Sequence, residues 1–545
     1  MTIYYACKYA PAELLESFGL TPERLDPAPV SFDCADSCLH PNLCGFGKGV
    51  VETAAAQDIR ALVLTDCCDV MRRVYDALRE RGTLDFLWLL PLPHKKGEAE
   101  QRRFRNGLAK LAEALEAYTG RAPDLTRLRP PEPVPVPEGE FISLAGAHGG
   151  ERLLRRVETA CGLPVRDDTC SGARNVAWRE NVGDTLAAFL DWYAPALLGQ
   201  RPCMRMLHVG GRGELWEPRQ RGIVYHTLKF CDYYSFEYAD RKDRVAVPLL
   251  KIETDGTETE SGQLDTRLMA FAETIRSRPV PAGKRTGVRY AAGVDVGSAG
   301  TKAVVLDGGG NLLGRALAHS GTGAARGAAR ALDEALAQAG LTRSDLDTVI
   351  TTGYGRANTG LEADAITEIT CHARGARHLM SGVRTVIDIG GQDSKVIRLD
   401  DTGRVTGFVM NDKCAAGTGR FLEMMARVME LSLEELAETG LRWKQEVSIS
   451  SMCTVFAESE VVSLLARNTP APDVIHGLNC SVAEKTAALV RRADGAPAYL
   501  MTGGVARNAG VVRELSNKLG APVETHPLSQ FCGAVGAALL ALERV

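Results

Sequence analysis

Short apolar runs and longer runs of helical period alternate along the first half of the chain. The runs IRALVLTDCC and ISLAGAHGG are largely apolar, which is typical of strands buried in a parallel sheet. MRRVYDALRERG and LDTRLMAFAETI place apolar residues at helical spacing and predict the helices that cover such strands. We therefore expect two similar Rossmann-like parallel α/β domains that face each other across a cleft, where proteins often bind a cofactor.

Two proline-containing segments divide the chain. RAPDLTRLRPPEPVPVPEGE, residues 121–140, resists both helix and central strand and predicts an extended linker. A second joint is predicted over residues 278–287, within SRPVPAGKRTG. The expected domains are therefore residues 1–120, 141–277 and 288–545.

Three strand-like segments of the C-terminal piece end in glycine-containing turns. In AAGVDVGSAGTKAVVLDGGG, Asp295 ends a strand and a turn with Gly297 leads into a second strand, and RTVIDIGGQDSKVIRL repeats this arrangement around Asp388. Such turns wrap phosphates with backbone N–H groups, and glycine lets the backbone approach a polyphosphate closely. AYLMTGGVARN ends a strand at Gly503 and opens a helix, whose N-terminus suits an anion. Each turn alone is more often an ordinary hairpin.

Two DxG hairpins, followed much later by a strand, a glycine pair and a helix, resemble the superfamily of acetate and sugar kinases, heat-shock chaperones and actin. The resemblance implies a two-lobed ATPase with the nucleotide between its lobes. It also implies that Asp295 and Asp388 hold Mg²⁺ or orient the attacking water, as carboxylates do in phosphoryl transfer. The sequence has no P-loop of the GxxxxGK[ST] type. The residues expected to contact ATP are Gly297, Ser298, Thr301, Lys302, Gly390, Gly391, Gln392, Gly417, Gly419, Gly503 and Gly504.

Composition and charge exclude several classes of protein. A content of 45% hydrophobic and 24% charged residues is ordinary for a globular chain, and a net charge of −4 gives no basic footprint for nucleic acid. No apolar run is long enough to span a bilayer, and MTIYYACKYAP does not resemble a secretory leader, so we expect a cytoplasmic protein. Disulfides are rare in the cytosol, so several of the 15 cysteines are expected to bind metal or act in catalysis.

Two isolated cysteines stand out in the C-terminal piece. Cys414 in NDKCAAGTGRF and Cys453 in SSMCTVFAESE each lie where a loop gives way to a helix-forming run. Two thiolates cannot complete a four-cysteine iron-sulfur cubane. A two-fold dimer repeats the same patch, so two chains together would supply four thiolates around one cluster.

Residues 291–545 also resemble, almost throughout, the ATPase activators of 2-hydroxyacyl-CoA dehydratases, the BadF/BadG/BcrA/BcrD type. The resemblance implies a homodimer with one bridging [4Fe-4S] cluster bound by Cys414 and Cys453, and ferredoxin or flavodoxin as the electron donor. The motifs that carry it are GVDVGSAGTK, TTGYGR, ITEITCHARGA, TVIDIGGQDSKV, MNDKCAAGTGRFLE, SSMCTVFAESEV, MTGGVARN and GAVGAAL.

In the N-terminal half, HPNLCGFGKG, LTDCCDVMRRVYD and TLKFCDYYSFEY resemble a cluster-bearing subunit of those dehydratases and the related double-cubane cluster proteins. The resemblance implies cluster ligation by Cys44, Cys68 and Cys231. Two linked cubanes would need six ligands, and the additional candidates are Cys34, Cys38, Cys67 and Cys170. The cysteines for which simple packing is the favoured interpretation are Cys7, Cys161, Cys203, Cys371, Cys480 and Cys532. Arg174, Lys229 and Glu237 are expected either to line a substrate pocket or to lie on the surface.

The expected protein is an oxygen-sensitive iron-sulfur ATPase that uses ATP to transfer low-potential electrons from the bridging cluster to a fused acceptor module, which reduces an acyl-CoA or another small molecule. One alternative is a stand-alone activase whose acceptor is a separate dehydratase. Another is a nucleotide-gated redox sensor, and a simple small-molecule kinase is hard to reconcile with Cys414 and Cys453.

Overall fold

The computed structural model describes residues 1–94, 97–131, 137–172, 174–179, 184–200, 203, 217–257, 262–276, 289–319, 323–411, 417–449 and 454–544. The chain forms two compact units, Met1–Leu268 and Met269–Val545. The predicted joint at residues 278–287 lies outside the described residues, so the domain limits stay a prediction. None of the helices in the described part of the chain is long and apolar enough to cross a bilayer.

The first unit begins with a parallel four-stranded sheet of order β2-β1-β3-β4. Its strands are β1 Thr2–Tyr5, β2 Thr21–Arg24, β3 Ala61–Asp66 and β4 Phe86–Pro91. Its helices are α1 Ala12–Ser17, α2 Asp33–Asp36, α3 Gly45–Ala56, α4 Asp69–Arg81 and α5 Glu98–Thr119, followed by the 3₁₀ turn η1 Leu125–Arg127. Helix α4 follows the predicted pattern, because Met71, Val74 and Leu78 form its buried stripe.

A second parallel sheet, of order β6-β5-β7-β8, completes the first unit. Its strands are β5 Phe141–Gly146, β6 Val165–Thr169, β7 Gln220–Leu228 and β8 Leu249–Thr254. The helices of this part are α6 Gly150–Cys161, α7 Leu186–Leu198 and α9 Asp232–Arg241, with the 3₁₀ turn η3 Lys242–Arg244, and α10 Gly262–Arg276 contains the boundary between the two units. Helix α7 does not cover this sheet, because Phe189 and Tyr193 pack with Phe104 and Leu108 of α5 in the core of the preceding sheet.

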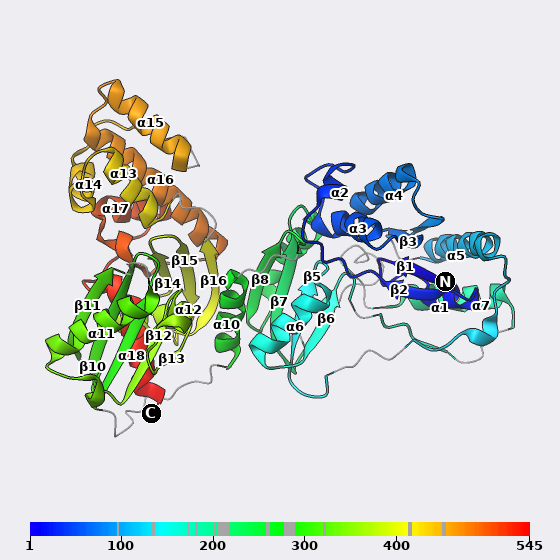
Figure 1. Cartoon of the computed structure of the whole chain (residues 1–545), viewed down its shortest axis with the longest axis horizontal. Coiled ribbons are helices and arrows are strands. Elements are labelled where there is room, and N and C mark those ends of the chain that lie inside the picture. The colour runs from blue at the N-terminus through cyan, green and yellow to red at the C-terminus, as the bar shows by residue number, and fades with distance from the viewer. Residues whose placement is uncertain are drawn as a thin grey trace. The chain divides into compact units, whose positions relative to one another are not determined.

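The second unit contains two five-stranded sheets of the same topology, β11-β10-β9-β12-β13 and β16-β15-β14-β17-β18 (Figure 1). The strands of the first are β9 Tyr290–Val296, β10 Gly300–Asp307, β11 Leu312–His319, β12 Thr348–Thr352 and β13 Asp364–Ala365. Those of the second are β14 Thr385–Ile389, β15 Ser394–Leu399, β16 Val405–Asn411, β17 Tyr499–Thr502 and β18 Val523–Glu524. In both sheets the first three strands form an antiparallel meander and the later strands add in parallel. The repeated topology indicates a two-lobed, internally duplicated fold.

Helices pack against both sheets of the second unit. They are α11 Ala324–Ala339, α12 Glu368–Leu379, α13 Gly419–Val428, α14 Leu433–Thr439, α15 Thr454–Ala466, α16 Ala471–Arg492, α17 Ala509–Leu519 and α18 Cys532–Arg544. The short 3₁₀ turns are η4 Arg343–Asp345, η5 Arg356–Asn358, η6 Gly440–Arg442, η7 Gly504–Arg507 and η8 Ser529–Phe531.

Helices α12 and α18 approach so closely that their contact needs glycine. A Cβ on Gly536 would lie 1.7 Å from the backbone oxygen of Cys371, and one on Gly375 would lie 2.1 Å from that of Cys532. Cys371 and Cys532 are completely buried at this contact and pack as small hydrophobic residues. The predicted fold class is confirmed: two Rossmann-like parallel α/β sheets are followed by a two-lobed unit of the actin-like type.

Candidate nucleotide site and cysteine centres

The two DxG hairpins of the second unit are equivalent in register. Asp295 pairs with Lys302 across β9 and β10, and Asp388 pairs with Lys395 across β14 and β15. The two turns also approach each other, because a Cβ on Gly391 would lie 2.9 Å from the Cβ of Ala299. The structure therefore brings the two turns that the sequence indicates for phosphate binding to one place.

Asp388 is buried among polar partners. Thr502 Oγ1 donates a hydrogen bond to its carboxylate over 2.9 Å, and His372 Nδ1 and Lys395 Nζ lie 3.5 and 3.3 Å from its oxygens. Burial opposes ionisation of Asp388, but His372 and Lys395 favour it more strongly, and the pKa of Asp388 falls to about 2. This carboxylate is therefore ionised at neutral pH and can bind a cation or orient a water molecule.

Lys395 links three carboxylates. Its Nζ lies 2.7 Å from Asp393, 3.3 Å from Glu368 and 3.3 Å from Asp388. Burial alone would lower the pKa of Lys395, but the three carboxylates raise it well above its usual value. Burial also raises the pKa of Glu368. Lys302 is less constrained, since its Nζ lies 4.0 Å from the Asp295 carboxylate.

Sequence reasoning missed several polar residues of this network, namely Glu368, His372, Asp393, Lys395 and Thr502. A usable signal was present, because DVGSAGTK and DIGGQDSK place a lysine seven residues after each aspartate. Glu368, His372 and Thr502 come from α12 and β17, and no local motif joins those segments to the hairpins.

The predicted ATP contacts fall into different environments. Ser298 and Gln392 are exposed on the two turns, whereas Thr301 is completely buried. Gly503 has a φ of +83°, and a Cβ there would lie 2.3 Å from the Ile389 backbone oxygen, so this turn requires glycine. Beside Gly504, in contrast, there is open space.

The start of α13 is held on the second hairpin turn. The backbone N–H of Gly419 donates to the Gly390 oxygen over 2.9 Å, and that of Arg420 donates to the Gly391 oxygen over 2.8 Å. Gly417, just before α13, has a φ of +95°. Cys414 and Cys453 lie outside the described residues, and the helices that follow them, α13 and α15, begin at Gly419 and Thr454.

In the first unit, three predicted ligands occupy the same local position. Cys44, Cys68 and Cys231 are the N-cap residues of α3, α4 and α9. The sulfur of Cys68 accepts a hydrogen bond from the Met71 backbone N–H over 3.4 Å. The partial positive charge at a helix N-terminus favours a thiolate, the form of cysteine that binds metal.

Contacts near these helix starts bring the three N-termini together. A Cβ on Gly47 of α3 would lie 2.4 Å from Val70 of α4. Phe46 in the first turn of α3 and Cys231 at the start of α9 pack against the same apolar core. The N-capping thiols of α3, α4 and α9 therefore border one region at the carboxyl ends of β3 and β7.

A second group of cysteines was not expected from the sequence. The side chain of Cys7 is hydrogen-bonded to that of Cys67, and Cys203 belongs to the same core cluster. The Cys67 contact and burial raise the pKa of the Cys7 thiol. All three side chains contribute to the core between β1, α5 and α7, whereas the adjacent Cys68 caps α4. The dipeptide Cys67–Cys68 therefore takes part in two different cysteine groups.

Other predicted residues lie elsewhere. Cys34 contacts Arg81 Nη1 over 2.9 Å, at the opposite end of α4 from Cys68, and Cys38 is also hydrogen-bonded to Arg81. Because α4 has 13 residues, its two ends are about 18 Å apart, so the structure does not bring Cys34 and Cys38 to the N-capping group. Cys170 packs against the cores of both sheets.

Of the three polar residues expected either to line a pocket or to lie on the surface, Lys229 lies on the surface, whereas Arg174 and Glu237 are largely enclosed and have structural contacts. Arg174 forms a buried ion pair with Glu13, Glu237 accepts a hydrogen bond from Tyr225, and Lys229 lies 3.6 Å from Asp255.

Comparison with known proteins finds a matching protein family for each half of the chain. The profile of the BadF/BadG/BcrA/BcrD ATPase family matches residues 292–541, and that of the 2-hydroxyglutaryl-CoA dehydratase D-component matches residues 7–130 and 142–275. Over 254 residues the chain is 44% identical to the 2-hydroxyisocaproyl-CoA dehydratase activator of Clostridioides difficile, which covers 47% of this chain and 95% of the relative. The chain belongs to the BadF/BadG/BcrA/BcrD ATPase family.

Other members of the BadF/BadG/BcrA/BcrD ATPase family show the same extent of similarity. The activator of lactoyl-CoA dehydratase from Anaerotignum propionicum is 48% identical over 254 residues, 47% of this chain and 98% of the relative. The solved structure of Acidaminococcus fermentans (R)-2-hydroxyglutaryl-CoA dehydratase component A is 45% identical, covers 47% of this chain and 98% of its own, and has a TM-score of 0.46. The predicted resemblance of both halves is confirmed, and the second unit is an ATPase domain.

Proposed function

We propose that this chain uses ATP to drive low-potential electrons from a [4Fe-4S] cluster, bound by Cys414 and Cys453 of two chains, to a cysteine-bound cluster in its own first unit. The observation that carries the proposal is the grouping of Cys44, Cys68 and Cys231 at three neighbouring helix N-termini of a chain that also contains the ATPase domain. An iron-sulfur cluster, when bound, supplies a one-electron carrier of low potential.

On the ATPase side, Asp295 and Asp388 would hold Mg²⁺ or position the attacking water, and the facing hairpin turns would hold the phosphates. Their hard oxygen atoms suit Mg²⁺. Lys395 holds Asp388, Asp393 and Glu368 in place. The helices after Cys414 and Cys453 would then transmit the nucleotide state to the bridging cluster.

On the acceptor side, the structure supports two groups of three thiols. Cys44, Cys68 and Cys231 form the first, and the second is Cys7, Cys67 and Cys203, in place of the predicted Cys34 and Cys38. Six thiolates are what two linked cubanes require, and the Cys67–Cys68 dipeptide would join their two ligand sets.

Relatives named as activators of 2-hydroxyacyl-CoA dehydratases favour a second candidate function. In that case the ATPase domain reduces a separate dehydratase, and the first unit holds no cluster. In both cases we propose a homodimer, with ferredoxin or flavodoxin as the donor.

Iron and acid-labile sulfide per chain, measured on anaerobically purified full-length protein, separate these functions. A bridging cluster alone gives about two irons per chain, whereas one or two further cubanes give about six or ten. Replacing both Cys68 and Cys231 by serine should remove iron from the first unit, and Cys414→Ser should remove about two irons per chain.

The matched control is Cys38→Ser, which should keep the full iron content. A wild-type content of about two irons per chain would reject the fused acceptor and favour the stand-alone activase. Iron loss in Cys38→Ser without loss in Cys7→Ser would reject the second ligand group.

A further inference from the structure

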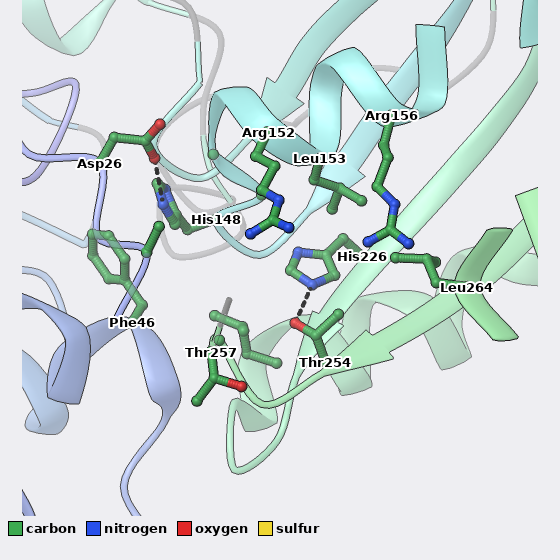
Figure 2. Close-up of a pocket in the computed structure, with 15 residues that line it drawn as sticks. Asp26, Phe46, His148, Arg152, Leu153, Arg156, His226, Thr254, Thr257 and Leu264 are labelled. Carbon is green, nitrogen blue, oxygen red and sulfur yellow. Dashed lines mark hydrogen bonds and ion pairs between the residues drawn. The ribbon is translucent and has the colours of Figure 1, made fainter. Parts of the chain in front are cut away.

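A small cavity lies within the first unit at the carboxyl ends of β5, β7 and β8. Its volume is about 110 Å³, and its walls include His148 after β5, His226 near the end of β7 and Thr254 at the end of β8 (Figure 2). In this sheet β6 lies on one side of β5 and β7 lies on the other, so the strand order reverses at β5. Parallel α/β sheets commonly bind ligands beside such a reversal, at the carboxyl ends of the strands.

Two guanidinium groups approach this cavity from one helix. Arg152 and Arg156 lie one turn apart on α6, and Figure 2 shows both side chains extending toward the space beside His226. Arg156 is oriented by Asp265, with Nη2 and Oδ1 2.8 Å apart. Arginine presents several N–H donors in a plane, which suits a carboxylate or another oxyanion.

The acidic residue of the cavity wall is already engaged. Asp26 Oδ1 lies 3.0 Å from His148 Nε2, and Asp26 Oδ2 accepts the Glu151 backbone N–H over 2.9 Å. Burial opposes ionisation of Asp26, but these two hydrogen bonds outweigh it and lower the pKa of its carboxyl. Its charge is thus directed toward His148 and the start of α6.

His226 and Thr254 form an uncharged part of the wall. Burial lowers the pKa of His226 to about 4, so its ring is uncharged and acts through hydrogen bonds. Its Nε2 and Thr254 Oγ1 are 2.9 Å apart.

The cavity also borders the first cysteine group. Phe46, one of its lining residues, lies in the first turn of α3, which Cys44 caps, and Leu228 precedes Cys231 by three residues. A ligand here would lie near the region where the proposed function places a cluster.

We propose that this cavity binds a small anion, a carboxylate or inorganic oxyanion of a few heavy atoms, between Arg152, Arg156 and His226. Pockets for ligands of drug size measure roughly 300–1,000 Å³, so a cavity of about 110 Å³ is too small to enclose a whole CoA thioester. The proximity to the acceptor cluster rests on the proposed function, but the binding itself does not.

The test is isothermal titration of the anaerobic full-length protein with acetate and, separately, with inorganic phosphate. One anion per chain should bind, and Arg152→Gln and Arg156→Gln should each weaken binding at least about tenfold, as expected for loss of a charged hydrogen-bonding partner. Arg155→Gln is the matched control, because Arg155 is an exposed residue of the same helix that does not line the cavity, and it should bind like the wild type.

Titration with lactoyl-CoA tests whether the cavity accepts only small anions. It should not displace the small anion, and displacement that depends on Arg152 would overturn the size limit in favour of an anionic group on a larger molecule. Absence of binding of both anions to the wild-type protein, or equal binding by both arginine variants and the wild type, would overturn the proposal.

ATP-driven reduction measured on the same samples separates this inference from the proposed function. Anion binding without ATP-driven electron transfer would reject only the function, whereas electron transfer without anion binding would reject only the cavity assignment.

Discussion

His226 should make the first unit less stable as the pH falls, and replacing it should remove this dependence. The ring is 2% exposed, and burial lowers its pKa from 6.5 to about 4. Between these values the unfolded chain binds the proton and the folded chain does not, so stability rises with pH across this window. Between about pH 7.5 and pH 5 the two pKa values correspond to a loss of about 2 kcal/mol of unfolding free energy.

The assay is urea unfolding of wild type and His226→Asn at both pH values, followed by tryptophan fluorescence. Four of the five tryptophans precede residue 269, so the signal reports mainly the first unit. His226→Asn should be less stable at pH 7.5, because it leaves a cavity, and its disadvantage should shrink by about 2 kcal/mol at pH 5. His94→Gln, a change at an exposed histidine, is the control. An unchanged difference between wild type and His226→Asn at the two pH values would refute the reasoning.

Three further predictions concern other parts of the chain. Asp388→Asn should lower ATP hydrolysis, measured as phosphate release, by at least about a hundredfold, because the carboxylate proposed to act on Mg²⁺ or water is lost; activity within a few fold of wild type would rule out that role. Gly536→Ala should destabilise the second unit by about 3 kcal/mol in thermal unfolding, since the new Cβ meets backbone 1.7 Å away, whereas Gly139→Ala has open space and should be nearly neutral. Arg174→Met should cost about 3–5 kcal/mol because it leaves the Glu13 carboxylate buried without its partner, and a double-mutant cycle with Glu13→Gln should recover part of that loss.

The sequence predicts strands and turns correctly where the residues of one short segment determine the local conformation. Strand β3 is completely apolar over its first four residues because both of its faces are buried. The DxG hairpins are recognisable because an aspartate at a strand end and glycines in the turn occur together, and the structure places both hairpins at the predicted positions. In these cases pattern and packing require the same conformation.

The missed features depend on contacts between distant segments. Glu368 and His372 lie on α12 and Lys395 lies on the second hairpin, so only the packing of α12 against that hairpin brings the three residues together. Cys7 and Cys203 have no neighbouring motif, so simple packing is the interpretation that the sequence favours for them. The adjacent pair Cys67–Cys68 did contain a clue, because consecutive residues at the end of a strand point to opposite sides and can serve two sites.

The charges of the proposed nucleotide site explain why we expect a divalent cation to accompany ATP. Asp388, Asp393 and Glu368 surround Lys395, while Asp295 has Lys302 only at 4.0 Å. Four carboxylates therefore face two ammonium groups and the His372 ring, and a triphosphate would add further negative charge. Bare ATP would meet repulsion at this site, whereas Mg²⁺ between the carboxylates and the phosphates would balance it. Since Lys395 already balances part of the Asp388 charge, Asp295 is the carboxylate with the most charge left to neutralise, and its removal should weaken Mg²⁺ dependence more than removal of Asp393.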